Sequence, residues 1–241
     1  MTTATWRDYP TYVQSMDPQC GPVWASLRQC ALTASRASYW AQRGTRFEKA
    51  PEVEAATICG LTEESFAPAQ VAAMSVGIAG EPIVRDWYSH KIGKPAQEVG
   101  VSVWKQDPRF RGSLDADVDG TLFAEFKIPQ FLYRPLVDHI QAIKRGFVPP
   151  PGYHAHIFDT HYDQITTNGI IHNRPFCDFI VVSHTKDVYA ERLPISQDHW
   201  DKVLYPAGCR FYDTYVTPLM QQHGLIRIDP PTSDASVNGV A

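Results

Sequence analysis

The sequence predicts an α/β (α+β) fold in which helices flank a central mixed β-sheet. Residues 99–128 show the alternation of apolar and polar residues that is typical of strands, and two further strand-like stretches cover 177–183 and 188–193. Helical patterns surround both groups of strands, a combination expected of a layered fold. These patterns cover about 22–43, 67–91, 159–173 and 196–222.

The chain has the size and composition of a globular domain. Of its 241 residues, 44% are hydrophobic and 20% are charged. Residues 5–225 contain neither an internal repeat nor a low-complexity run. We therefore expect residues 1–225 to form a single domain and residues 226–241 to be a disordered tail.

The first part of the chain combines turn signals with short helices. Pro10 and Pro18 predict that the first twenty residues are irregular, and a helix is expected to begin near Pro22. The hydroxyl groups of Thr33-Ala34-Ser35 suit the start of a second short helix over about 35–43. The stretch around them sets five basic residues against one acid, which makes it a candidate surface for DNA. These basic residues are Arg28, Arg36, Arg43, Arg46 and Lys49.

The middle of the chain changes from helix to strands. A long helix over 67–91 should be kinked at Pro82. Strands should follow at 99–103, about 110–116 and 121–128, the last two separated by turn residues at 117–120. In the third strand, Leu122, Ala124, Phe126 and Ile128 share one face and Phe123, Glu125 and Lys127 share the other. Further on, helices are expected at about 131–145 and 159–173, with a proline-rich loop between them, and at 196–222 with an interruption at Pro206.

Charge, cysteine content and hydropathy exclude several classes of protein. A formal charge of −4 argues against a surface that is positive throughout, but a local basic patch can still bind DNA. The five cysteines include no C-x-x-C pair, so we expect free thiols rather than a cysteine-held zinc or iron–sulfur site. The N-terminus lacks the apolar core of a signal peptide, and no run of eighteen apolar residues occurs. We expect a soluble intracellular protein with no membrane partner.

Three charged residues near the third strand form a candidate catalytic centre. Glu125 and Lys127, at i and i+2, project from one face, and Asp115 precedes them on the neighbouring strand. Two carboxylates placed close together favour a bound cation, and their hard oxygens suit Mg²⁺ or Mn²⁺. A lysine beside them can stabilise charge in a transition state. The alternative is a solvated strand face with Asp115 in a turn, since such a pattern is common.

A second candidate centre consists of histidines. His154, His156 and His161 lie at i, i+2 and i+7 near a loop and could bind Zn²⁺. No cysteine or second characteristic spacing accompanies them. The carboxylate centre is therefore the better candidate.

Four blocks of sequence stand in order over residues 24–182. The blocks are Trp24-Ala25-Ser26-Leu27-Arg28 through Leu32-Thr33-Ala34-Ser35, Gly77-x-x-x-Glu81-Pro82, Ser113-Leu114-Asp115 with Glu125-Phe126-Lys127-Ile128-Pro129, and Tyr162-Asp163-Gln164-Ile165 with Asp178-Phe179-Ile180. Together they resemble the lambda-exonuclease-like, viral-recombinase branch of the PD-(D/E)xK nuclease superfamily. The resemblance implies the restriction-endonuclease-like core of that superfamily.

The resemblance implies a role for each residue of the catalytic centre. Asp115 and Glu125, with the backbone carbonyl of Phe126, would bind Mg²⁺ or Mn²⁺, two ions in all, and Glu81 would supply a third carboxylate. Lys127 would activate the attacking water, and Gln164 would position the site from its helix. Taken alone, Glu81 and Gln164 also fit ordinary residues of a helix surface.

The resemblance also implies a pocket for a terminal 5′-phosphate. Arg28 offers a forked donor, and the helix start at Thr33-Ala34-Ser35 offers hydroxyls and backbone N–H groups, which together suit an anion. Arg28 could instead pair with an acid, and Trp24 is expected in the core. The pocket residues would be Arg28, Thr33, Ser35 and Ser113.

The sequence departs from the family pattern at a few positions. Ala116 stands where relatives have glycine, and His161 stands where they often have an aromatic residue. A further phosphate-binding arginine of the family has two candidates here, Arg43 and Arg46. These departures concern end preference and polarity more than the metal centre.

Together these observations predict a metal-dependent exonuclease that degrades linear double-stranded DNA 5′→3′ in phage or viral recombination or replication. The alternatives are a related endonuclease or end-trimming nuclease of other polarity, which would not need Arg28, and a DNA-binding domain without catalysis. The resemblance implies DNA ends, a single-strand annealing protein and a homo-oligomeric ring, often a trimer, as partners. The site of action would be the cytoplasm of the host cell, or the nucleus for a eukaryotic virus.

Overall fold

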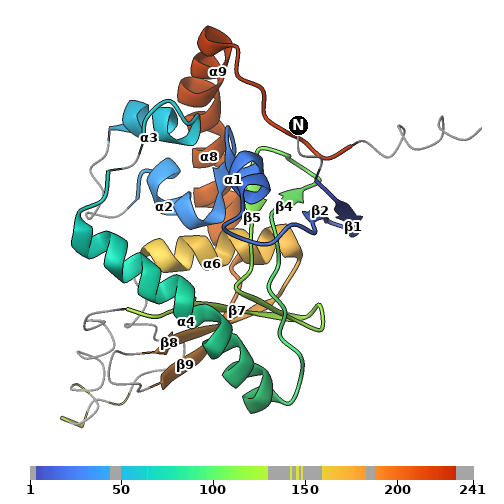
Figure 1. Ribbon diagram of the computed structural model, residues 1–241, viewed down its shortest axis with the longest axis vertical. Coiled ribbons are helices and arrows are strands. Elements are labelled where there is room, and N and C mark those ends of the chain that lie inside the picture. Colours follow the sequence, from blue (N-terminus) through green and yellow to red (C-terminus); the bar gives the residue numbers. More distant parts are fainter. Residues whose placement is uncertain are drawn as a thin grey trace, which may run out of the picture.

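The computed structural model confirms an α/β protein with mixed sheets flanked by helices (Figure 1). Two sheets are present in the described part of the chain, of five and four strands. The structure describes residues 4–43, 50–63, 65–129, 142, 145–146, 148, 159–182 and 188–231. The helix expected at about 131–145 falls almost wholly outside these residues, as do His154, His156, Arg46 and Lys49.

The five-stranded sheet has the order β1-β2-β4-β5-β3, with β3 parallel to β5 and the other pairs antiparallel. Its first two strands correct the expectation that the first twenty residues are irregular. Trp6 pairs with Ser15 in a hairpin. Pro10 lies in the turn between the two strands, where its missing N–H interrupts no hydrogen bond of the sheet. The strands are β1 (Trp6–Asp8), β2 (Tyr12–Ser15), β3 (Leu32–Thr33), β4 (Ser102–Trp104) and β5 (Phe110–Gly112).

The four-stranded sheet has the order β6-β7-β8-β9, with β7 and β8 parallel. The single strand expected at 110–116 is in fact two strands in different sheets, and Ser113–Asp115 joins them. The expected turn is shorter than 117–120, because only Asp119 and Gly120 have the positive φ of a tight hairpin loop. The strands are β6 (Ala116–Val118), β7 (Leu122–Lys127), β8 (Phe176–Val182) and β9 (Val188–Pro194).

Helices cover both faces of the four-stranded sheet. Phe126 on one face of β7 packs in a cluster with Val84 and Tyr88 of α4 (Pro68–Ile92). Phe123, on the opposite face, packs with Ile165 of α6 (Asp159–His172). The predicted alternation of β7 is therefore confirmed, and its charged residues lie on the α6 face.

The N-terminal helices pack beside the five-stranded sheet. The short helix expected at about 35–43 is confirmed in part, as η1 (Ala34–Arg36) followed by α2 (Ala37–Trp40). The helix α3 (Pro51–Ile58) was not expected, because glutamates obscure the pattern of its apolar residues. Its start is marked by Pro51 at the first helical turn. These helices are α1 (Pro22–Arg28), η1 (Ala34–Arg36), α2 (Ala37–Trp40) and α3 (Pro51–Ile58).

The C-terminal region is helical from residue 197 to 223 without the interruption expected at Pro206. A π-helical turn precedes Pro206, and this wider turn accommodates a residue that has no N–H to donate. The order is α7 (Gln197–His199), η2 (Trp200–Leu204), α8 (Tyr205–Phe211), η3 (Tyr212–Val216) and α9 (Thr217–His223). None of the described helices combines the length and apolar character of a membrane span.

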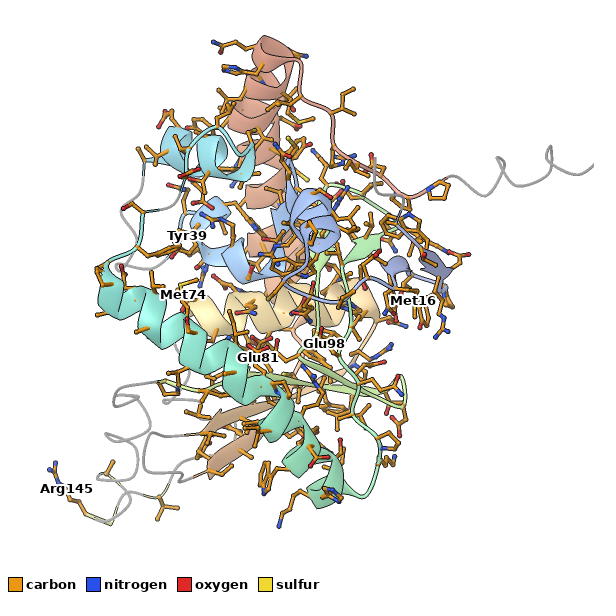
Figure 2. The ribbon with its side chains drawn as sticks, viewed as in Figure 1. Met16, Tyr39, Met74, Glu81, Glu98 and Arg145 are labelled. Atoms are coloured by element: carbon orange, nitrogen blue, oxygen red, sulfur yellow. The ribbon has the colours of Figure 1, made fainter. Side chains whose placement is uncertain are left out.

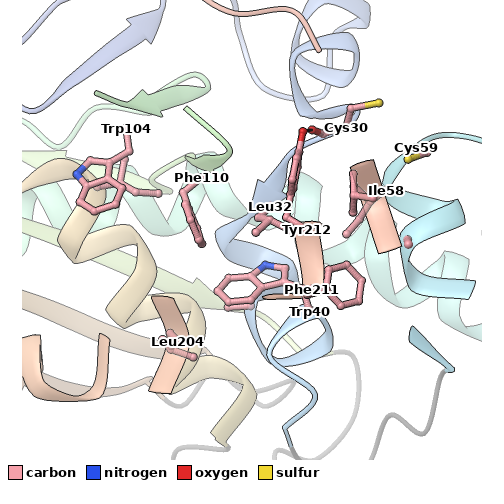
Figure 3. Close-up of a cluster of buried hydrophobic side chains, with 14 of the residues drawn as sticks. Cys30, Leu32, Trp40, Ile58, Cys59, Trp104, Phe110, Leu204, Phe211 and Tyr212 are labelled. Atoms are coloured by element: carbon pink, nitrogen blue, oxygen red, sulfur yellow. Dashed lines mark hydrogen bonds between the residues drawn. The ribbon is translucent and has the colours of Figure 1, made fainter. Parts of the chain in front are cut away.

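The largest hydrophobic cluster joins the C-terminal helices to the five-stranded sheet (Figure 3). Trp40, Phe110 and Trp200 are fully buried in it, with their rings in edge-to-face contact. As expected, the cysteines are free thiols. In the described part of the predicted tail, Asp229 and the carbonyl of Ile228 accept hydrogen bonds from the buried Arg111.

Gly112 brings β5 into close contact with α6, and its replacement tests this packing. A Cβ there would lie 2.3 Å from Asn168 Oδ1. Gly112→Ala should therefore lower the free energy of unfolding by roughly 1–3 kcal/mol, measured by urea denaturation. Gly77→Ala is the control, since nothing lies within 4 Å of its Cβ position in α4; it should stabilise the helix slightly. Equal stability of both variants would contradict the packing described.

Candidate active site

Three elements converge on the candidate catalytic centre. Asp115 lies in the crossing between the two sheets, Glu125 and Lys127 lie on β7, and Gln164 lies in the first half of α6. Glu125 is buried, with an exposed fraction of 1%, while the other three are partly exposed. The fold thus brings together four of the residues that the sequence singles out.

Glu125 is the centre of a hydrogen-bonded group. Its Oε1 accepts from Lys127 Nζ at 2.6 Å and from Gln164 Nε2 at 2.6 Å. Lys127 Nζ also lies 3.4 Å from Gln164 Oε1. The predicted shared face of Glu125 and Lys127 is therefore confirmed, and Gln164 orients both side chains.

Asp115 is fixed beside this group by the backbone. Its Oδ2 accepts from the N–H of Phe126 at 2.8 Å, and its own carbonyl accepts from Arg85 Nε at 2.6 Å. A second nitrogen of Arg85, Nη2, forms an ion pair of 3.0 Å with Glu98 without the geometry of a hydrogen bond. Sequence reasoning missed Arg85; its signal was its position one helical turn after Glu81.

The acids of this centre repel one another. Burial and then the charge of Glu125 raise the pKa of Asp115 to about 7. Burial and the charge of Asp115 likewise raise the pKa of Glu81, on α4, to about 7. Figure 2 shows Glu81 and Glu98 near each other between α4 and the sheets. For Lys127, burial opposes the charged form, but Glu125 and Asp115 outweigh it and its pKa is raised.

The donor set fits a hard divalent cation in part. Glu125 Oε2 is buried and has no hydrogen-bond partner among the described residues, so one carboxylate oxygen is available to a ligand. Asp115, Glu125 and the carbonyl of Phe126 are the oxygens that could hold such an ion. However, no three His, Cys, Asp or Glu side chains in the described ranges are arranged to hold a metal together. The role of Glu81 as a third ligand therefore stays a prediction.

The residues predicted to form a phosphate pocket also lie close together. Arg28 Nη2 donates to Ser35 Oγ at 2.8 Å, and Thr33 Oγ1 lies 3.5 Å from the same oxygen. Ser113 accepts from Trp24 Nε1 at 3.2 Å, and the Arg28 guanidinium lies 4.1 Å from the centre of the Trp24 ring. Trp24 thus connects the four predicted residues. We expected Trp24 in the core, but it is partly exposed.

Trp24, Arg28 and Thr33 line a cavity of about 700 Å³, whereas Ser35 and Ser113 are not among its lining residues. α3 and α4 contribute further walls, including Phe66 just before α4 and Met74 within it. Figure 2 shows Met74 on the side of α4 that faces the N-terminal helices. The pocket is therefore large enough for more than a phosphate group.

Two of the described cations in the basic stretch, Arg36 and Arg43, pair with buried acids. Arg36 makes two hydrogen bonds, of 2.5 and 2.6 Å, to the fully buried Glu54. Arg43 pairs with the buried Asp163 at 3.1 Å. Both cations serve internal ion pairs, because burying a carboxylate requires a partner. Arg43 is therefore a poor candidate for the further phosphate-binding arginine.

The zinc alternative gains no support from the described histidine. The ring of His161 packs against Phe179, with 5.6 Å between ring centres. The other two histidines of that pattern lie outside the described residues.

Comparison with solved structures places the fold. The chain is similar to the alkaline exonuclease LHK-Exo from Laribacter hongkongensis, with a TM-score of 0.60 and 23% identity over 85% of this chain and 98% of that one. LHK-Exo in complex with dAMP gives 0.61 and 21% over the same shares. A phage-related exonuclease from Haemophilus somnus 129PT gives 0.55 and 10% over 80% and 98%. The chain has the fold of these exonucleases.

At the level of the fold, this likeness confirms the resemblance drawn from the four sequence blocks. The shared region is 80–85% of the chain. No protein-family model matches the sequence, and no curated protein matches it significantly.

The raised pKa of Asp115 predicts a pH-dependent stability. Its pKa rises from about 4 in the unfolded chain to about 7 in the folded protein. The folded state then binds the proton more tightly, so stability falls as pH rises across this window. In EDTA at pH 8, the free energy of unfolding of Asp115→Asn should exceed that of wild type by roughly 1–3 kcal/mol. Urea denaturation measures this difference.

At pH 4 this advantage should nearly vanish, because the folded wild-type protein is then protonated at Asp115 and the unfolded chain is about half protonated. Asp86→Asn, at an exposed acid on α4, is the control. An advantage of Asp115→Asn that is equal at both pH values would contradict the repulsion described.

Proposed function

We propose that the protein is a metal-dependent exonuclease that degrades linear double-stranded DNA from its 5′ end. One observation carries the proposal: the phosphate pocket and the acidic centre meet in the three-residue crossing Ser113–Asp115. Ser113 belongs to the pocket through Trp24, and Asp115 belongs to the centre. Two residues of extended chain span at most about 7 Å. A phosphate held in the pocket would therefore leave a neighbouring phosphodiester near Asp115.

The residues of the centre suit phosphodiester hydrolysis. A Mg²⁺ or Mn²⁺ ion held by Asp115, Glu125 and the Phe126 carbonyl, or a pair of ions, would supply Lewis-acid activation there. Lys127 is held as an ammonium ion by Glu125 and Gln164, and its charge faces the acids. In that position its charge can orient the attacking water and favour its deprotonation, or stabilise the negative charge of the transition state. Gln164 fixes the geometry of both groups.

The pocket accounts for the direction of digestion. A 5′-terminal phosphate carries more charge than an internal phosphodiester, and the guanidinium and hydroxyls of Arg28, Thr33 and Ser35 provide donors for it. Cleavage of the next bond would release a mononucleotide and leave a new 5′-phosphate for the same pocket. Repetition of this cycle gives 5′→3′ digestion.

The biological setting that we propose follows the solved structures with this fold. One of them is described as phage-related and another was solved with dAMP, which supports a DNA substrate and a role in phage or viral recombination or replication. A single-strand annealing protein and a homo-oligomeric ring, such as a trimer, are the partners that we propose. The protein would act inside the infected cell.

Separate variants of Glu125 and Lys127 test the division of roles. Glu125→Gln should abolish Mg²⁺-dependent digestion and weaken metal binding, because it removes a ligand charge. Lys127→Ala should lower kcat by about 10²–10³-fold but retain the metal, because its charge acts on the reacting atoms. Digestion of labelled duplex and calorimetric titration with Mg²⁺ measure the two effects. Loss of metal binding in Lys127→Ala, or digestion by Glu125→Gln at the wild-type rate, would refute these roles.

Arg28→Ala tests the direction of digestion. Charge-assisted hydrogen bonds are worth about 1.5–3 kcal/mol, so the variant should digest 5′-phosphorylated duplex about 10- to 100-fold more slowly and 5′-hydroxyl duplex nearly as fast as wild type. Duplexes labelled at either end, with closed circular DNA beside them, give the measurement. Digestion from the 3′ end, or nicking of circles at the linear rate, would instead support an endonuclease or trimming nuclease of other polarity.

A further inference from the structure

Arg111, on β5, is a fully buried arginine with an exposed fraction of 0%. Arginines are rarely buried unless their charge and donors are matched. Its Nη1 donates to the carbonyl of Leu27 in the last turn of α1. Its Nη2 donates to the carbonyl of Ile228 at 2.6 Å and to Asp229 Oδ1 at 2.7 Å. One side chain thus links α1 to the segment after α9.

The carboxylate that balances Arg111 comes from this C-terminal segment. Burial lowers the pKa of Arg111 to about 10, and the charge of Asp229 opposes that shift, so Arg111 is protonated at neutral pH. Asp229 also binds Arg227, at 2.7 and 2.9 Å. Without Asp229, the cations Arg111 and Arg227 would repel each other at this point.

A second chain of hydrogen bonds runs from the segment to the same turn. Arg227 Nη1 donates to the hydroxyl of Tyr212 at 3.0 Å, and that hydroxyl donates to the carbonyl of Cys30 at 3.0 Å. Figure 1 shows the chain after α9 running back toward the five-stranded sheet. The C-terminal segment therefore braces the end of α1 at Leu27 and the chain just after it at Cys30, on either side of Arg28.

Arg111 also adjoins the rest of the phosphate pocket. It stands opposite Thr33 in the parallel pairing of β3 with β5. Ser113 follows it by two residues. Its hydrogen bond to Leu27 lies one residue from Arg28, so a shift of Arg111 would move three of the four pocket residues.

We propose that Asp229 is a positioning residue for the recognition of the 5′ end, acting through Arg111 to hold the α1 turn that carries Arg28. This inference rests on the proposed function, because it needs the pocket to receive a terminal phosphate. Asp229 acts at a distance and touches no substrate.

Asp229→Asn removes the charge and keeps the size of the side chain. Its matched control is Asp119→Asn, in the β6–β7 hairpin: the two carboxylates pair with Arg111 and Lys94, and their side chains are 41% and 38% exposed. In full-length protein, Asp229→Asn should raise KM for 5′-phosphorylated duplex about 10-fold and change kcat and the KM for 5′-hydroxyl duplex little. Asp229→Glu should retain most of the affinity, and Asp119→Asn should match wild type.

Amide hydrogen exchange of residues 27–33, measured without DNA, reads the bracing directly and should be faster only in Asp229→Asn. If wild type distinguishes the two kinds of end, and Asp229→Asn changes neither exchange nor KM, the inference is overturned. If wild type does not distinguish them, the proposed function is at fault, and unchanged exchange in Asp229→Asn would overturn the bracing as well.

Discussion

The chain passes from one sheet to the other in three residues, Ser113–Asp115, and this short crossing determines where both parts of the site lie. Before it, Gly112 lets β5 approach α6 so closely that a Cβ would meet Asn168. After it, β6 pairs with β7 and sets the register that places Asp115 beside Phe126. Because the crossing is only three residues long, a movement of the pocket would also move the acidic centre.

The acidic centre places charge where the interior can tolerate it only with compensation. Glu125 is buried and hydrogen-bonded on one oxygen, and burial raises the pKa values of Asp115 and Glu81 to about 7. Lys127 and Arg85 supply two positive charges against these three acids, and Arg85 also pairs with a fourth acid, Glu98. A site built for stability alone would lack this imbalance, since buried like charges destabilise the folded state. The imbalance is the electrostatic argument for a cation ligand.

Local patterns predicted the parts of the structure that depend on neighbours in sequence. The alternation of β7 has a period of two, so the shared face of Glu125 and Lys127 followed from spacing alone. The β1–β2 hairpin and the partners of Arg36 and Arg43 did not follow, because they depend on pairings between distant segments. A basic side chain looks the same in sequence whether it meets DNA or a buried carboxylate, and burial decides between the two. The same ambiguity hid Arg85.

Two arginines hold the two parts of the site by the same construction. Arg85 donates to the carbonyl of Asp115 and pairs with Glu98, while Arg111 donates to the carbonyl of Leu27 and pairs with Asp229. Arginine suits this role because its planar fork can bind a carbonyl and a carboxylate at once. Each arginine fixes the backbone at or beside a residue of the site, Asp115 or Arg28. The side chain of that residue then has fewer conformations to lose when it binds a ligand. In the proposed exonuclease, geometry fixed in this way would be set before substrate binds, which would reduce the entropy lost on reaching the transition state.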